Sequence, residues 1–132
     1  MGQKNSLGVQ QVAPEGNAAY VLEFSEMVTQ GDHATKKVTS VEAKFPPGRI
    51  VITQAADAML DELKLNKLAF LQRHLNADWG ELAEEDRLQN DEALKSGNDR
   101  IFSSYPLPNK EKLWIITEWD KSATTLLLPQ DY

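Results

Sequence analysis

The sequence predicts a single α+β domain: a C-terminal three-stranded antiparallel meander packed on two or three short helices, with an N-terminal β addition. Three observations favour this class. Residues 100–129 hold three runs of β-branched and aromatic residues separated by short polar turns. Residues 53–75 carry apolar side chains at helical spacing. The length of 132 residues, with 41% hydrophobic and 26% charged residues, is ordinary for one globular domain.

The first third of the chain is expected to contain two segments. Residues 1–16 are polar and include three glycines and a proline, so we expect a flexible arm. Residues 17–46 are the predicted N-terminal β addition. The run AAYVLEFSEMV (18–28) fits either strand alternation or helical spacing. The polar QGDH that separates it from the β-rich KKVTSVEAKF favours a hairpin.

Two short helices are expected after the stop FPPG, which marks the start of a predicted core at residues 47–132. Thr53 can cap the first helix by accepting a hydrogen bond from a first-turn amide. Asn66 can cap the second, KLAFLQRHL, to give an αα-hairpin. The first helix has an apolar stripe at i, i+3, i+4 and i+7, formed by Ala56, Met59, Leu60 and Leu63.

A third helix is expected at about 83–96, mostly exposed because its apolar content is thin, and ending at Gly97-Asn98. The runs RIFSSYPL, KLWIITEW and ATTLLLP then form the meander, with PNKE and DKS as its turns.

The turn at DKS decides which residues of the meander share a face. If it centres on Lys121, Trp114 and Ile116 lie on one face, and we expect both in the core. Leu126 and Leu128 belong to that same face in this register. Because both faces carry apolar residues, both need cover. The helices cover one, and the N-terminal segment or a second copy of the chain, as a homodimer through the β-sheet, covers the other.

Charge is concentrated in one segment. The net charge is −6, and residues 76–99 account for all of it with two basic and eight acidic residues. The sequence has no basic stripe that could follow the phosphate backbone of a nucleic acid, which disfavours direct nucleic-acid binding. The chain has no cysteine, no apolar run long enough for a membrane span and no apolar signal region at its start. We therefore expect a cytoplasmic protein without membrane contact.

The acidic segment has a functional and a structural interpretation. As a partner-binding surface it could speed encounter with a basic protein through complementary potentials. A row of carboxylates could also imitate spaced phosphates and occupy a nucleic-acid groove of a DNA-binding or defence protein. The structural interpretation is a solvated helix. The candidate partner-binding residues are Glu81, Glu84, Glu85, Asp86, Asp91 and Trp119.

Three residues are candidates for metal or catalytic chemistry. His74 and Asp78 stand at i, i+4, as in some metal sites, but no EF-hand pattern or zinc histidine pair is present. We predict no metal, no cofactor and no catalytic residue. Glu118 is the candidate for a carboxylate with a raised pKa, and its ordinary role would be an ion pair with Lys121. A small enzyme using carboxylates near Trp79 and Glu118 stays an alternative.

Two further expectations concern the stretch RHLNADWG. Trp79 should be buried and clamp two helices together, with Gly80 in a conformation that a Cβ would hinder. His74 should face Asp78 or a helix end. Trp119, at a turn, should be the most exposed of the three tryptophans.

Several motifs occur in one order: GRIVITQAADAML, ADWG, EDRLQNDEAL, SSYPLP, WIITEWDKSATTLLLP and the terminal tyrosine. In these the chain resembles a family of small bacterial proteins often encoded on plasmids and integrative elements, the plasmid-related proteins. The resemblance covers about residues 48–132 and carries over no catalytic residue. It implies a non-enzymatic accessory protein of a mobile element that acts by protein–protein contact.

Overall fold

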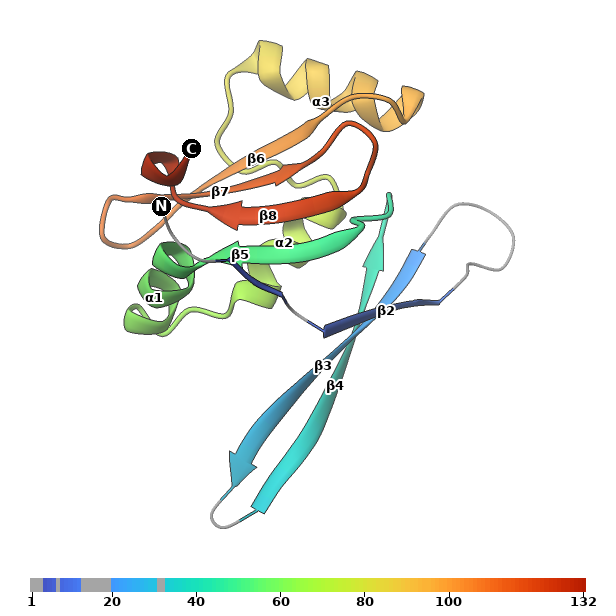
Figure 1. The fold of residues 1–132 in the computed structure, drawn as a ribbon. Coiled ribbons are helices and arrows are strands. Elements are labelled where there is room, and N and C mark those ends of the chain that lie inside the picture. The colour runs from blue at the N-terminus through green and yellow to red at the C-terminus, as the bar shows by residue number, and fades with distance from the viewer. Residues whose placement is uncertain (1–3, 7, 13–19, 31–32) are drawn as a thin grey trace.

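The computed structural model describes residues 4–6, 8–12, 20–30 and 33–132. Within these residues the chain is α+β, as predicted, with two β-sheets and three α-helices (Figure 1). The elements in chain order are β1 (Lys4–Ser6), β2 (Gly8–Val12), β3 (Tyr20–Gln30), β4 (His33–Ala43), β5 (Arg49–Thr53), α1 (Gln54–Glu62), α2 (Lys67–Leu75), α3 (Glu84–Ser96), β6 (Ile101–Pro106), β7 (Lys112–Thr117), β8 (Ala123–Leu127) and the 3₁₀ helix η1 (Pro129–Asp131).

The main sheet has the strand order β1-β5-β8-β7-β6. Strands β6, β7 and β8 pair antiparallel in succession, whereas β5 pairs parallel to β8. The sheet is therefore mixed, and the predicted three-stranded antiparallel sheet is only part of it. Strand β5 was not predicted. Its sequence RIVIT is buried at every position after Arg49, and such an apolar run is typical of a strand covered on both faces.

The second sheet has the order β2-β3-β4, and the predicted hairpin of residues 17–46 is confirmed by the pairing of β3 with β4. Figure 1 shows this hairpin extending away from the main sheet. Strands β1 and β2 lie within the expected flexible arm of residues 1–16, and they pair with β5 and β3 respectively. These strand partners come from elsewhere in the chain, and tertiary pairing overrides weak local β propensity.

The base of the hairpin belongs to the hydrophobic core. Leu22, Val41, Ala43 and Phe45 are each at most 4% exposed and join the same cluster as the main sheet and helices. The amide of Lys44 also donates to the carbonyl of Leu75 at the end of α2, at 2.8 Å. The base of the hairpin thus adds side chains to the core that residues 47–132 form.

The helix boundaries agree with the local signals. The Thr53 hydroxyl accepts from the Ala56 amide at 3.2 Å, and the Asn66 side chain accepts from the Leu68 amide at 2.9 Å. Helix α3 ends at Gly97, which has a φ of 74°. Both predicted caps and the predicted stop of α3 are confirmed, because each depends on residues within one helical turn.

The predicted register of β7 against β8 is wrong by one residue. Trp114 pairs with Leu127 and Ile116 with Thr125, since the turn spans residues 119–122 and centres between Asp120 and Lys121. A one-residue shift moves a strand's side chains to the opposite face. Trp114 and Ile116 therefore share a face with Leu127 and Thr125, and not with Leu126 and Leu128. On this face, which lies away from α2, Trp114 is half-buried, whereas Ile116 is 5% exposed, as expected for a core residue.

The outer edge of β6 is closed by hydrogen bonds from outside the sheet. The Asn90 side chain of α3 accepts from the Phe102 amide at 3.0 Å and donates to its carbonyl at 2.6 Å. The Ser104 amide donates to the Trp79 carbonyl, and the Ser104 carbonyl accepts from the Glu81 amide. These contacts occupy edge groups that could otherwise pair with another strand.

Candidate functional site

Helix α3 presents the predicted acidic surface. Glu84, Glu85 and Asp86 form its first turn, and Glu81 and Asp91 lie before and along it, all exposed to solvent. Carboxylates at a helix N-terminus interact favourably with the helix dipole. Ala83, at the N-cap position, makes no side-chain capping bond, so part of this charge has a structural role.

Trp119 does not join the acidic residues. It is 63% exposed, as expected, and lies in the β7–β8 turn. Lys121 holds this turn beside the end of α3 by donating to the Asp99 carbonyl at 3.0 Å. A helix rises about 1.5 Å per residue, so α3 places roughly 20 Å between Trp119 and the carboxylates of its first turn. The six predicted partner-binding residues therefore form an acidic group and a separate tryptophan.

An exposed leucine lies among the carboxylates. Leu88 is 58% exposed, and together with Leu82, Glu84, Arg87 and Asp91 it lines a hollow of about 340 Å³. We call this the helix hollow. Leu88 is one of the few apolar residues of this helix, which was expected to lie mostly exposed. The structure explains the exposure of Leu88: two residues along a helix correspond to about 200°, which puts Leu88 opposite the buried Asn90.

Asp91 also has a structural contact. The indole of Trp79 donates to its carboxylate at 3.3 Å, and Trp79 is 6% exposed. The predicted burial of Trp79 is confirmed, and the side chain links the α2–α3 connection to α3. The predicted special backbone of Gly80 is confirmed as well. Its φ is 72°, and an added Cβ would meet the Ser104 carbonyl oxygen at 2.1 Å.

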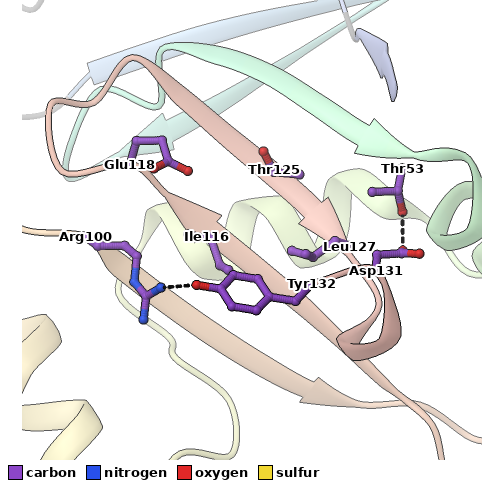
Figure 2. A pocket seen from close by; sticks show the side chains of 8 residues that line it. All are labelled: Thr53, Arg100, Ile116, Glu118, Thr125, Leu127, Asp131 and Tyr132. Carbon is purple, nitrogen blue, oxygen red and sulfur yellow. Dashed lines mark hydrogen bonds between the residues drawn. The ribbon is translucent and has the colours of Figure 1, made fainter. Parts of the chain in front are cut away.

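A second hollow lies on the main-sheet face that does not contact α2. We call it the sheet hollow; its volume is about 210 Å³, and Figure 2 shows the residues around it. Ile116, Thr125 and Leu127 come from β7 and β8, and Glu118 follows β7. The expected ion pair of Glu118 with Lys121 is not formed, because the Lys121 ammonium binds backbone carbonyls instead.

Hydrogen bonds hold the C-terminal segment beside the sheet hollow. The Thr53 hydroxyl donates to Asp131 Oδ2 at 2.7 Å, and the Leu128 amide donates to the same oxygen at 3.0 Å. The Arg100 guanidinium donates to the Tyr132 hydroxyl at 2.9 Å. The Tyr132 ring also meets the Trp114 ring edge-on, with centroids 6.0 Å apart.

His74 does not face Asp78 or a helix end. It is fully buried, with Nδ1 against the Ser103 hydroxyl and Nε2 2.9 Å from Thr117 Oγ1. Thr117 is 2.7 Å from Thr124 Oγ1, which donates to the Pro47 carbonyl at 2.8 Å. Burial lowers the pKa of His74 to about 3, so the ring is neutral at physiological pH. The expectation failed because α2 turns His74 towards the sheet.

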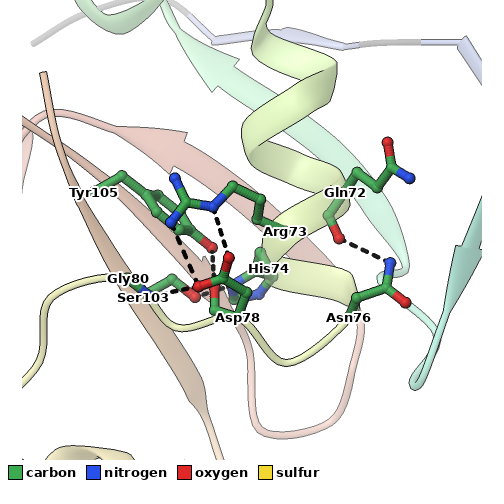
Figure 3. Close-up of polar contacts among 8 residues, drawn as sticks. All are labelled: Gln72, Arg73, His74, Asn76, Asp78, Gly80, Ser103 and Tyr105. Atoms are coloured by element: carbon green, nitrogen blue, oxygen red, sulfur yellow. Dashed lines mark hydrogen bonds and ion pairs between the residues drawn. The ribbon is translucent and has the colours of Figure 1, made fainter.

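Asp78 is instead paired with Arg73, as Figure 3 shows. The two side chains meet at 2.8 Å, and this hydrogen bond lowers the pKa of Asp78. The Arg73 guanidinium carbon lies 4.6 Å from the centre of the Tyr105 ring, and Tyr105 donates to the Asp78 carbonyl at 2.8 Å. This group closes the loop after α2 and leaves His74 and Asp78 in separate environments.

The carboxylates near Trp79 and Glu118 do not form one site. Trp79 packs edge-on against His74, which binds Ser103 and Thr117 on the covered face of the main sheet. Glu118 lines the sheet hollow on the other face. Among the described residues, no group of three or more histidine, cysteine, aspartate or glutamate side chains is arranged to hold a metal ion.

Comparison with known proteins gives no match: no protein-family model, curated protein or solved structure is similar to this chain. In the part of the chain that the structure describes, the longest helix, α3, has 13 residues, and none meets the length and apolarity that a bilayer-spanning helix needs.

Proposed function

We propose that the protein is a non-enzymatic binding protein that contacts another protein through the surface of α3. One observation carries this proposal: Leu88 is 58% exposed within an acidic helix and borders the helix hollow. Contact surfaces combine an apolar centre, whose burial supplies affinity, with a charged rim that supplies orientation, and Leu88 with its acidic neighbours has this arrangement. The resemblance to plasmid-related proteins supports a role as an accessory protein of a bacterial mobile element.

The chemistry of α3 indicates the kind of partner. Glu84 and Asp91 lie beside Leu82 and Leu88 around the helix hollow. A complementary surface would carry basic side chains around an apolar group. Complementary charge mainly raises the association rate and is screened by salt, whereas the apolar contact is not.

Imitation of nucleic acid is less well supported by this geometry. A phosphate mimic needs a continuous row of negative charge without an apolar centre. On α3 the row is interrupted by Leu88 and Arg87, and Lys95 lies 3.9 Å from Glu92 near its end. The decoy hypothesis therefore becomes one outcome of the test below.

The experiment compares proteins captured from a bacterial lysate by the parent, by Leu88→Ser and by the combined variant Glu84→Gln and Glu85→Gln, at physiological and high salt. Glu111→Gln, an exposed carboxylate in the β6–β7 turn, is the matched control. We expect a partner retained by the parent and the control and lost by Leu88→Ser. If the protein is a decoy, Leu88→Ser should still capture DNA-binding proteins. The combined Glu84→Gln and Glu85→Gln variant, or the parent at high salt, should then fail to capture them. Capture that is identical for all four proteins would contradict a role for α3.

A further inference from the structure

We propose that the sheet hollow binds an extended aliphatic diamine. Its two carboxylates lie at opposite ends, Glu118 at one and Asp131 at the other, with Ile116 and Leu127 between them (Figure 2). A diamine has the matching order of groups, with an ammonium group for each carboxylate and methylene groups for the apolar residues between them. This site is independent of the α3 surface and of the partner proposed for it.

Each end of the hollow carries a carboxylate, and Arg100 lies at the Glu118 end. Glu118 is exposed, and among the described residues it takes part in none of the ion pairs. Asp131 receives both of its hydrogen bonds, from Thr53 and Leu128, on Oδ2. Its other oxygen, Oδ1, accepts no hydrogen bond from the described residues, so the proposed ligand would bind Oδ1. An ammonium group bound to a carboxylate forms a charge-assisted hydrogen bond, which is stronger than a neutral one.

The middle of the hollow suits methylene groups. Ile116 and Leu127 are 5% and 6% exposed and form an apolar floor. The Tyr132 ring lies along one side, where it can contact methylenes and attract a nearby cation through its face. Its contacts with Trp114 and Arg100 hold this ring in place before a ligand arrives. A preformed site loses less conformational entropy when a ligand binds.

Other small ligands fit this arrangement less well. Arg100 could attract an anion and repel a cation at the Glu118 end, but the side chains of the lining include two carboxylates and one guanidinium, so their net charge disfavours an anion. A zwitterion would place its carboxylate beside Glu118 or Asp131. A monoamine would satisfy one carboxylate only. A divalent metal needs several oxygens around one point, whereas these two carboxylates lie at opposite ends.

Calorimetric titration with 1,4-diaminobutane at low salt tests the proposal. We expect saturable binding of one molecule by the parent, at least tenfold weaker binding by Glu118→Gln, and unchanged binding by the control Glu111→Gln. Asp131→Asn should also weaken binding, and Glu118→Gln is the more direct variant because its exposed side chain is not part of the fold. Melting without ligand should be the same for the parent, Glu118→Gln and Glu111→Gln.

Two comparison ligands and one further variant complete the test. Butylamine and the amide of N-acetyl-lysine, each with one ammonium group, should bind at least tenfold more weakly than the diamine. Equal binding of the lysine amide would overturn the two-carboxylate arrangement. Binding that survives in Glu118→Gln but is lost in the combined Glu84→Gln and Glu85→Gln variant would place the diamine on α3. Either that result or no saturable binding by the parent would overturn the proposal.

Discussion

The two faces of the main sheet carry similar residue types with different consequences. On the face covered by α2, Thr117 and Thr124 are both 0% exposed, and their hydroxyls bind each other, His74 and the Pro47 carbonyl. On the open face, Thr125 is 8% exposed and lines the sheet hollow. Polar groups on the covered face must therefore satisfy one another, whereas Thr125 on the other face lines a hollow that opens to solvent.

The covered face illustrates how strict this requirement is. No buried side-chain nitrogen or oxygen of the described residues lacks a hydrogen-bond partner. A buried group without a partner loses its hydration and gains nothing in return. His74 connects α2 to three strands through hydroxyl and carbonyl partners, so its role in the structure is to order the core rather than to bind a ligand.

The largest expected effect comes from removing the hairpin that helps to cover this face. A chain that starts at Pro47 would lack Phe45, whose ring meets the His74 ring edge-on at 5.4 Å, and the buried Leu22, Val41 and Ala43. We expect it to lose its cooperative melting transition, because water would reach the buried hydrogen bonds of His74 with Ser103 and Thr117. Calorimetry and near-ultraviolet circular dichroism check this; a cooperative transition near that of the parent would show instead that residues 47–132 fold alone.

Truncation of one large residue on each face compares their packing directly. Ile115→Ala, at 0% exposure on the covered face, should lower the free energy of unfolding by about 3–4 kcal/mol. Trp114→Ala, half-buried on the open face, should lower it by about 2 kcal/mol despite the larger side chain. Urea denaturation measures both values. A larger loss for Trp114→Ala would mean that the open face is covered in solution, for example by a second copy of the chain.

Acid should destabilise the covered face through His74. Its pKa is about 3 when folded and about 6.5 in an unfolded chain, so the unfolded state binds more protons between these values. The stabilisation is present above pH 6.5 and is lost as the pH falls towards 3. Between pH 7 and pH 4.5 we expect a loss of about 2 kcal/mol from this group.

The variant His74→Gln isolates this contribution, because glutamine can bind a hydroxyl but does not titrate. Its free energy of unfolding should vary less with pH than that of the parent, whatever its value at pH 7. Urea melts at several pH values provide the slopes. Equal slopes for the two proteins would show that His74 is not buried as a neutral ring.

The closure of β6 predicts an intermediate effect. Asn90→Ala removes the side chain that binds both the amide and the carbonyl of Phe102. We expect a loss of about 1–3 kcal/mol, the usual cost of leaving buried polar groups unpaired. Light scattering should also show association at high concentration, since the uncovered strand edge can pair with another chain. Asp86→Ala, on the same helix but exposed, should show neither effect.

The smallest effect is expected on the surface of α3. Replacing Glu84, Glu85 and Asp86 together with serine removes three favourable contacts with the helix dipole but also relieves their mutual repulsion. The melting temperature should fall by no more than about 4 °C. Each of calcium, magnesium and zinc should change the melting temperature by the same amount in the parent and in the variant. An ion that raises melting sharply in the parent alone would show that these carboxylates bind metal.

The sequence by itself determined the features that depend on neighbouring residues. Thr53 and Asn66 begin helices and Gly97 ends one because a cap needs only the amides or carbonyls of the adjacent turn. The burial of Trp79 and the exposure of the acidic residues followed from similarly local patterns.

Only the tertiary structure decided which groups face one another. A turn centred half a residue earlier placed Trp114 and Ile116 on the same face as Leu127 and Thr125 instead of Leu126 and Leu128, because side chains alternate along a strand. Strand β5 reached β8 across more than sixty residues of chain, and α2 directed His74 towards Ser103 and Thr117 instead of Asp78. Both sites depend on such long-range arrangements, since a hollow or a buried ring is defined by the elements around it and not by its own sequence.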